Sequence, residues 1–130
     1  MIRYLLLAAI LILAGCAGPG SSGSPSPSLL ADNVQISVVA APVCPVETTP
    51  PDPSCAPRPL AGVELKLSGP RTVILISNAD GLAIGTLPAG SYTVTPQPTK
   101  LAMGTAGAFD LIVPASGSIG ATATYDTGIR

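Results

Sequence analysis

Hydrophobic and polar residues alternate along much of the chain. Val34, Ile36 and Val38 are separated by polar residues, and this period of two places one side of a β-strand on a core and the other toward water. The spacing predicts a first strand over 33–41. Six further segments rich in Val, Ile, Leu or Thr predict strands over residues 63–67, 73–76, 82–87, 91–95, 109–113 and 118–125.

Short turns separate the predicted strands. Residues 78–81 read Asn-Ala-Asp-Gly, a tight-turn sequence whose glycine suits a positive φ, and residues 88–90 read Pro-Ala-Gly. No helical period is found in the segments between them. The pattern therefore predicts an all-β fold, a seven-stranded antiparallel β-sandwich with Greek-key or related connections.

One long connection interrupts this regular spacing. Residues 42–59 contain seven prolines, so neither a helix nor a paired strand is expected there. The stretch is long for a connection inside a compact domain. We therefore expect a further constraint to hold it in place.

The N-terminus has the pattern of an export signal. One positive charge at Arg3 precedes the apolar run 5–13, whose nine residues fall short of the roughly 20 that a membrane span needs. A cleaved signal peptide is the interpretation, and an uncleaved transmembrane anchor is the alternative. Residues 13–16, Leu-Ala-Gly-Cys, resemble the lipobox of bacterial lipoproteins. The resemblance implies cleavage after Gly15 and a lipid on Cys16, which anchors the chain on the extracytoplasmic face of the cell membrane or outer membrane.

This interpretation divides the chain into three parts. Residues 1–15 are the lipoprotein signal peptide, 16–32 the lipidated cysteine with a Gly/Ser/Pro linker, and 33–130 the β-sandwich domain. It also accounts for an odd number of cysteines. If Cys16 carries lipid, the remaining pair is Cys44 and Cys55, which we expect to form a disulfide across the proline-rich loop in an exported chain.

Charge and composition exclude several classes of function. After residue 15 the chain has five basic and seven acidic residues, a net charge of about −2 with no basic face, so nucleic acid is not an expected partner. The chain has no histidine, which removes histidine-based triads, acid–base catalysis and metal sites. We therefore predict no enzymatic activity, no catalytic residues, no metal and no cofactor.

A few acidic and aromatic residues have two interpretations. Glu47 and Asp52 could meet across the proline-rich loop as a weak cation site, but solvated loop charges are favoured. Asp80 is interpreted as a turn residue because the other acidic ligands of a calcium loop are missing. Tyr92 is expected in the core together with Phe109. Packing in the core or at a sheet edge is favoured over ligand contact for Tyr125, the remaining aromatic residue of the domain.

The order of the motifs resembles one known family. The sequence Cys-Pro-Val-Glu from Cys44, the proline-rich loop to Cys55, the segment 58–63 (Arg-Pro-Leu-Ala-Gly-Val), the turn 78–81 and the segment 87–94 (Leu-Pro-Ala-Gly-Ser-Tyr-Thr-Val) together resemble carboxypeptidase regulatory-like domains. The resemblance runs from about residue 33 to the end. It implies a transthyretin-like (prealbumin-like) seven-stranded sandwich.

The chain departs from this family pattern in two places. Leu82 stands where a Phe is expected, and 98–107 lacks a further cysteine that some relatives carry. A transthyretin-like shape also suggests hydroxyisourate hydrolase, but the histidines and the Tyr-Arg-Gly-Ser ending of those enzymes are missing. The sequence thus predicts a lipid-anchored extracytoplasmic module with a non-enzymatic binding or envelope-structural role. The alternatives are a glycan- or peptide-binding module that uses the Cys44–Cys55 loop and, with least support, an enzyme; an envelope protein or glycan is the expected partner besides the membrane.

Overall fold

The computed structural model describes residues 32–130; the predicted signal peptide, Cys16 and residues 17–31 of the linker lie outside the described part. Nearly all of its regular structure is β-sheet. The elements are β1 (Val34–Ala41), the short 3₁₀ turn η1 (Pro53–Cys55), β2 (Arg58–Pro59), β3 (Glu64–Ser68), β4 (Val73–Ile76), β5 (Leu82–Gly85), β6 (Gly90–Pro96), β7 (Phe109–Val113) and β8 (Ile119–Asp126).

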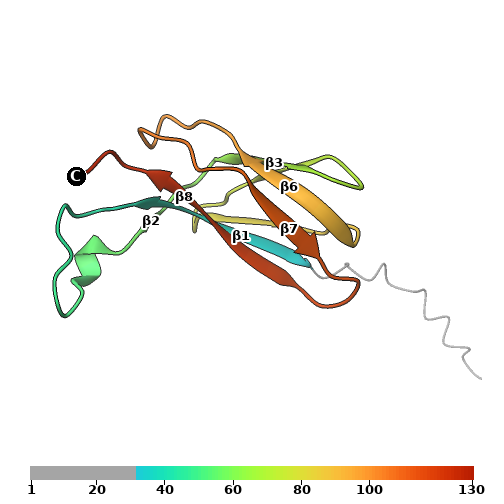
Figure 1. The fold of residues 1–130 in the computed structure, drawn as a ribbon, viewed down its shortest axis with the longest axis horizontal. Helices are drawn as coiled ribbons and strands as arrows, with labels where there is room; N and C mark the ends of the chain where they lie inside the picture. Colours follow the sequence, from blue (N-terminus) through green and yellow to red (C-terminus); the bar gives the residue numbers. More distant parts are fainter. Residues whose placement is uncertain (1–31) are drawn as a thin grey trace, which may run out of the picture.

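The strands form two sheets of four that pack face to face (Figure 1). In one, which we call sheet A, β1 pairs with β5 and β2 on one side and with β8 on the other. In the second, sheet B, the order is β4-β3-β6-β7 and every pair is antiparallel. The predicted all-β sandwich is confirmed.

The structure differs from the expected seven antiparallel strands in two details. The additional strand, β2, lies inside the proline-rich segment and pairs with Val39 and Ala40 of β1. Two residues are too few to show a period of two, so the hydrophobic pattern could not reveal them. The pairing of β1 with β8 is parallel, which requires a long connection between the two strands. Here the whole of residues 42–118 provides that connection.

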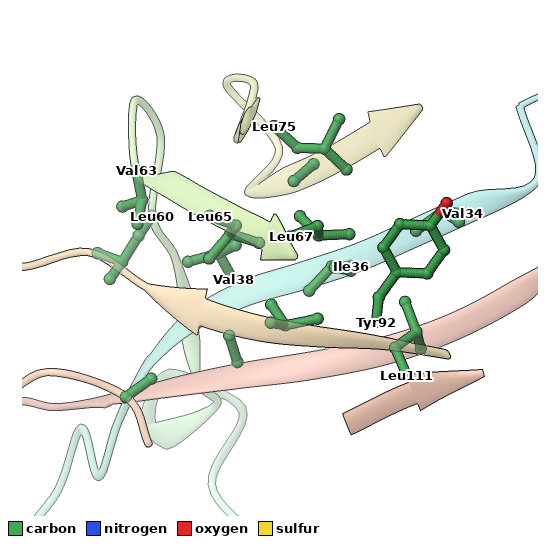
Figure 2. Close-up of a cluster of buried hydrophobic side chains, with 14 of the residues drawn as sticks. Val34, Ile36, Val38, Leu60, Val63, Leu65, Leu67, Leu75, Tyr92 and Leu111 are labelled. Atoms are coloured by element: carbon green, nitrogen blue, oxygen red, sulfur yellow. The ribbon is translucent and has the colours of Figure 1, made fainter. Parts of the chain in front are cut away.

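The core lies between the sheets and follows the predicted alternation (Figure 2). Val34, Ile36 and Val38 of β1 are buried while Gln35 between them is exposed. They face residues of sheet B, among which Leu65 of β3 is fully buried. Every buried hydrophobic side chain of the described chain lies between residues 34 and 125. This segment therefore contains a complete core of its own.

A buried serine, Ser77, links the end of β4 to the segment between β2 and β3. Ser77 is only 4% exposed, and it is the only buried polar residue within 32–130. Its hydroxyl donates to the C=O of Leu60 at 2.6 Å and accepts from the N–H of Val63 at 3.0 Å. Both bonds satisfy backbone groups that are buried away from water, and such groups are costly to leave unpaired.

The direction of β1 places Asp32 and the proline-rich loop at opposite ends of the sandwich. The described chain enters the sandwich at Asp32 at one end, and β1 runs from there to Ala41 at the other (Figure 1). Eight residues of strand span about 26 Å. The proline-rich loop 42–57 therefore lies at the end of the sandwich that is remote from Asp32.

Candidate functional site

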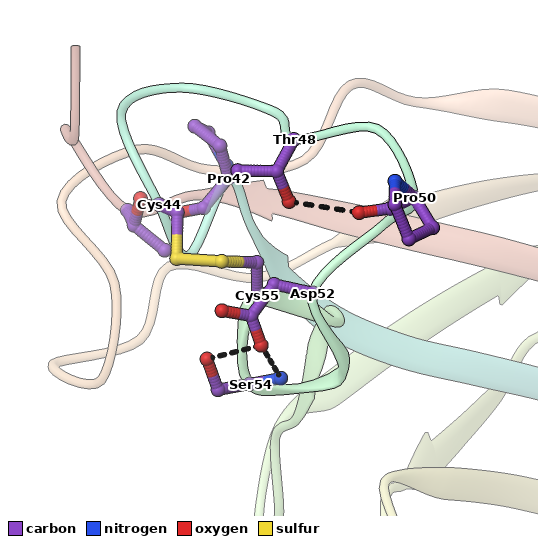
Figure 3. Close-up of a disulfide and its surroundings, with 8 residues drawn as sticks. Pro42, Cys44, Thr48, Pro50, Asp52, Ser54 and Cys55 are labelled. Atoms are coloured by element: carbon purple, nitrogen blue, oxygen red, sulfur yellow. Dashed lines mark hydrogen bonds between the residues drawn. A yellow bond between two sulfur atoms is a disulfide. The ribbon is translucent and has the colours of Figure 1, made fainter.

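The candidate site is the loop 42–57, between β1 and β2. A disulfide joins Cys44 to Cys55 near its two ends, with the Cα atoms 5.3 Å apart (Figure 3). The bond joins the two limbs of the proline-rich loop. The sequence predicts such a constraint, because the loop is long and has no regular strand pairing. The loop therefore projects from the sandwich as a closed unit.

Local hydrogen bonds shape the loop around Asp52. Its carboxylate oxygen Oδ1 accepts hydrogen bonds from the backbone N–H and the hydroxyl of Ser54, each at 2.8 Å, and so begins the turn η1 (Figure 3). The two hydrogen bonds, first that of the backbone and then that of the hydroxyl, lower the pKa of Asp52. On the other limb the hydroxyl of Thr48 donates to the C=O of Pro50 at 3.0 Å. Asp52 is therefore a fixed, ionised group at neutral pH.

The loop forms a cavity of about 400 Å³ that is open to solvent. Its walls are mostly apolar and come from the loop alone, namely Glu47, Thr48, Pro51, Asp52, Pro53, Cys55, Ala56 and Pro57. Glu47 and Asp52, which the sequence suggested could meet across the loop, thus line the same cavity. Neither carboxylate forms an ion pair within residues 32–130. An apolar hollow with a few polar groups is the usual form of a small binding site.

The C-terminal tail fixes the base of the loop. Thr127 follows β8, and its backbone N–H donates to the C=O of Ala41 at 3.3 Å while its hydroxyl donates to the C=O of Pro42. Asp126 forms an ion pair with Arg130 at 2.8 Å. The hydrogen bond from Arg130 is the main reason that the pKa of Asp126 is lowered to about 2, and the N–H of Gly128 adds to the effect.

Other candidate residues have structural roles. In the turn 78–81 the side-chain oxygen of Asn78, and not Asp80, accepts the backbone hydrogen bonds, from the N–H groups of Asp80 (2.9 Å) and Leu82 (3.0 Å). The rule that Asn and Asp both close such turns could have identified Asn78. Gly81 has φ +73°, and a Cβ there would lie 2.7 Å from the C=O oxygen of Val38, so glycine is required.

The three aromatic residues of the described chain pack in or against the core. Tyr92 and Tyr125 are fully buried, and Phe109 is partly buried against the core. The Tyr125 hydroxyl donates to the C=O of Gln97 at 2.6 Å, and burial raises its pKa. Tyr125 is therefore a core residue whose hydroxyl holds the loop 97–108. Neither Tyr92 nor Tyr125 therefore offers a ring face on which a sugar could stack.

No group of three or more potential metal ligands occurs among residues 32–130. Over the same residues no helix is long and apolar enough to cross a membrane. Cys16, the predicted lipidation site, lies outside the described part of the chain. Its role stays a prediction from the sequence.

Comparison with known proteins identifies the fold but no family. No family model matches the chain, and no curated protein does. A structure of the Bacillus anthracis TIE protein is similar over 74% of this chain and 16% of its own, with a TM-score of 0.56 and 14% identity. The fimbrial protein FimP from Actinomyces oris matches over 74% of this chain and 30% of its own, with a TM-score of 0.48 and 15% identity. This chain thus spans less than a third of either protein, and the first likeness shows a shared β-rich fold alone.

Proposed function

We propose that this protein is a lipid-anchored extracytoplasmic module that presents the disulfide-bonded loop away from the membrane and has a non-enzymatic binding or envelope-structural role. The observation that carries the proposal is the course of β1, which separates Asp32, the residue that follows the predicted linker segment 17–31, from the loop 42–57 by the length of the sandwich. A tether at one end leaves the other end free to meet a partner. The carboxypeptidase regulatory-like resemblance supports the same kind of module.

The disulfide supports an extracytoplasmic location. Cys44 and Cys55 are bonded at the tip of the domain, in a loop that water reaches. Such bonds persist in oxidising compartments and are rare in a reducing cytosol. The lipobox-like sequence before Cys16 supplies the export signal and the anchor that this location requires.

Replacement of Cys16 tests the anchor. In Cys16→Ser we expect the protein to leave the membrane fraction and to lose the mass of the lipid, because serine has no thiol to carry a diacylglyceryl thioether. Ser21→Ala in the linker is the matched control and should remain membrane-bound at the wild-type mass. A Cys16→Ser protein that stays in the membrane fraction with unchanged mass would contradict the proposal.

The cavity of the loop favours a second candidate, the binding of a glycan or peptide. Its apolar walls and two carboxylates are suited to a ligand that has both an apolar surface and a donor or positive group. Glycan and peptide arrays probed with the wild-type protein test this directly. Binding of a ligand in the cavity should be lost in the double variant Glu47→Gln/Asp52→Asn and in Cys44→Ser. It should be retained in the control Glu64→Gln, which changes an exposed carboxylate on sheet B. Absence of any ligand would contradict this candidate and leave the structural role.

A further inference from the structure

The outermost strand of sheet A has an open edge. All eight residues of β8 pair with β1 in one continuous register. The N–H of Ile119 donates to the C=O of Asn33 at 2.8 Å, which fixes the side on which each residue bonds. Backbone groups point to alternate sides along a strand, so those of Gly120, Thr122 and Thr124 point away from β1.

These outward backbone groups have no partner in the described chain. Within residues 32–130 no hydrogen bond reaches the N–H or C=O of Gly120, Thr122 or Thr124, and all three residues are exposed. The next outward carbonyl, that of Asp126, is already bonded. It accepts from the N–H groups of Met103 at 3.1 Å and Gly104 at 3.0 Å. The edge is therefore open over 120–124 and closed at the loop end.

The open edge lacks the features that normally prevent strand addition. Natural edge strands are usually short, bulged, or protected by proline or charge. Residues 119–125 contain no proline and no charged residue, and their pairing with β1 has no bulge. The edge strands β4 and β5 have only four residues each, and the edge strand β7 has five, one of which is the charged Asp110. β8 is thus the edge best suited to accept another strand.

We infer that β8 pairs with β8 of a second copy of this chain, antiparallel and centred on Thr122. In this register Thr122 lies opposite Thr122 of the second copy, and Gly120 lies opposite Thr124. In this register, every residue whose backbone groups point outward lies opposite another such residue of the second copy. Each pair exchanges both of its N–H···O bonds, so a two-fold axis through the Thr122 pair satisfies every open group of the edge.

Side-chain size and charge agree with a second copy as the occupant. The outer face of sheet A has a hollow of about 520 Å³ that Gly120 lines together with Gln35 and Ile84. Thr124 of the second copy would stand at the rim of this hollow, where glycine leaves space. Because residues 119–125 are uncharged, no like charges face each other across the axis. Asp126, just beyond, is neutralised by Arg130.

Both copies can be attached to one membrane. Antiparallel pairing offsets the two Ile119 residues by six positions, or about 20 Å along the strands. Residues 17–31 supply fifteen residues of linker, which reach about 50 Å when fully extended. The pairing is compatible with a lipid anchor on each copy. It places the two loops 42–57 at opposite ends of the dimer, so it does not rest on the proposed presentation of the loop away from the membrane.

Cysteine crosslinking in the full-length exported chain tests the register. In a hydrogen-bonded antiparallel pair the Cα atoms are about 5.5 Å apart, so Thr122→Cys can form a disulfide with itself across the axis. Thr124→Cys cannot, because the two copies of residue 124 are about 13 Å apart along the strands. Cys44 and Cys55 are already bonded to each other. Thr95→Cys places a cysteine at an exposed position of the central strand β6, so its crosslinking measures random collision between molecules.

Under a mild oxidant we expect Thr122→Cys to give a band of twice the chain mass on a non-reducing gel, about tenfold stronger than that of Thr124→Cys or Thr95→Cys. The combination of Gly120→Cys with Thr124→Cys should also crosslink. A Thr122→Cys signal no stronger than that of Thr95→Cys would overturn the inference. So would equal crosslinking by Thr124→Cys, or a crosslinked product that contains a different polypeptide.

Discussion

Loss of the Cys44–Cys55 bond should destabilise the domain through the unfolded state. The bond spans a sequence separation of 11, and closing a loop of this size removes on the order of 9 to 10 cal/mol/K of chain entropy from the unfolded ensemble. At 25 °C this corresponds to about 3 kcal/mol. Since a small domain has only about 5–15 kcal/mol of stability, Cys44→Ser with Cys55→Ser should lose a large share of it.

The native state should change little in this variant. Neither cysteine belongs to the hydrophobic core, and serine is close to cysteine in size. The strands and their pairing should therefore be retained, and far-ultraviolet circular dichroism should match the wild type. The denaturant dependence of unfolding should become steeper, because an unfolded chain without the crosslink exposes more surface.

Urea unfolding of a soluble form that begins at Ala17 measures the effect. Reduction of the wild-type protein should produce the same loss of about 3 kcal/mol as the double replacement, and Cys44→Ser alone should match the double variant. Thr48→Ala, which keeps the bond, is the control for the loop itself. A loss below about 1 kcal/mol in the double variant would refute the chain-entropy reasoning, and loss of the native circular dichroism spectrum would refute the view that the loop lies outside the core.

Two further predictions concern the loop end of the sandwich. Ser77→Ala leaves two buried backbone groups unpaired and should lower the free energy of unfolding by about 2–4 kcal/mol in urea titrations, whereas exposed Ser91→Ala should stay within about 0.5 kcal/mol of wild type. Asp126 has its pKa lowered from 3.8 to about 2 in the folded state, so its stabilising effect is complete above pH 4 and is lost as pH falls toward 2. Melting temperatures should fall over this range in the wild type and fall less in Arg130→Gln; identical profiles would contradict the assigned cause.

Local patterns were sufficient to identify most of the strands. Each of the seven predicted segments overlaps an observed strand, because the period of two depends only on which face of a strand is buried. The run 73–76 shows the limit of such patterns. It is apolar throughout, yet Ile74 and Ile76 are 57% and 58% exposed while Leu75 is buried. β4 is an edge strand of sheet B, and one of its faces remains in water.

The candidate site was only partly visible in the sequence. The proline-rich loop and its two cysteines indicated a closed loop, and the pair is bonded in the structure. The sequence favoured packing of Tyr125 in the core or at a sheet edge, and the fold buries it in the core with its hydroxyl bonded to the C=O of Gln97. The contact of Thr127 with Pro42, 85 residues apart in the chain, had no local signal.

The sequence by itself determined the strand segments and the lack of histidine, and it predicts an export signal, since alternation, apolar runs and residue counts are properties of neighbouring residues or of composition. Only the tertiary structure decided that β8 runs parallel to β1, that the loop 42–57 lies at the end of the sandwich remote from Asp32, and that Gly120, Thr122 and Thr124 form an open edge. The reason is physical: the strand pattern records which face is buried, whereas the order and direction of strands depend on contacts between residues far apart in the chain.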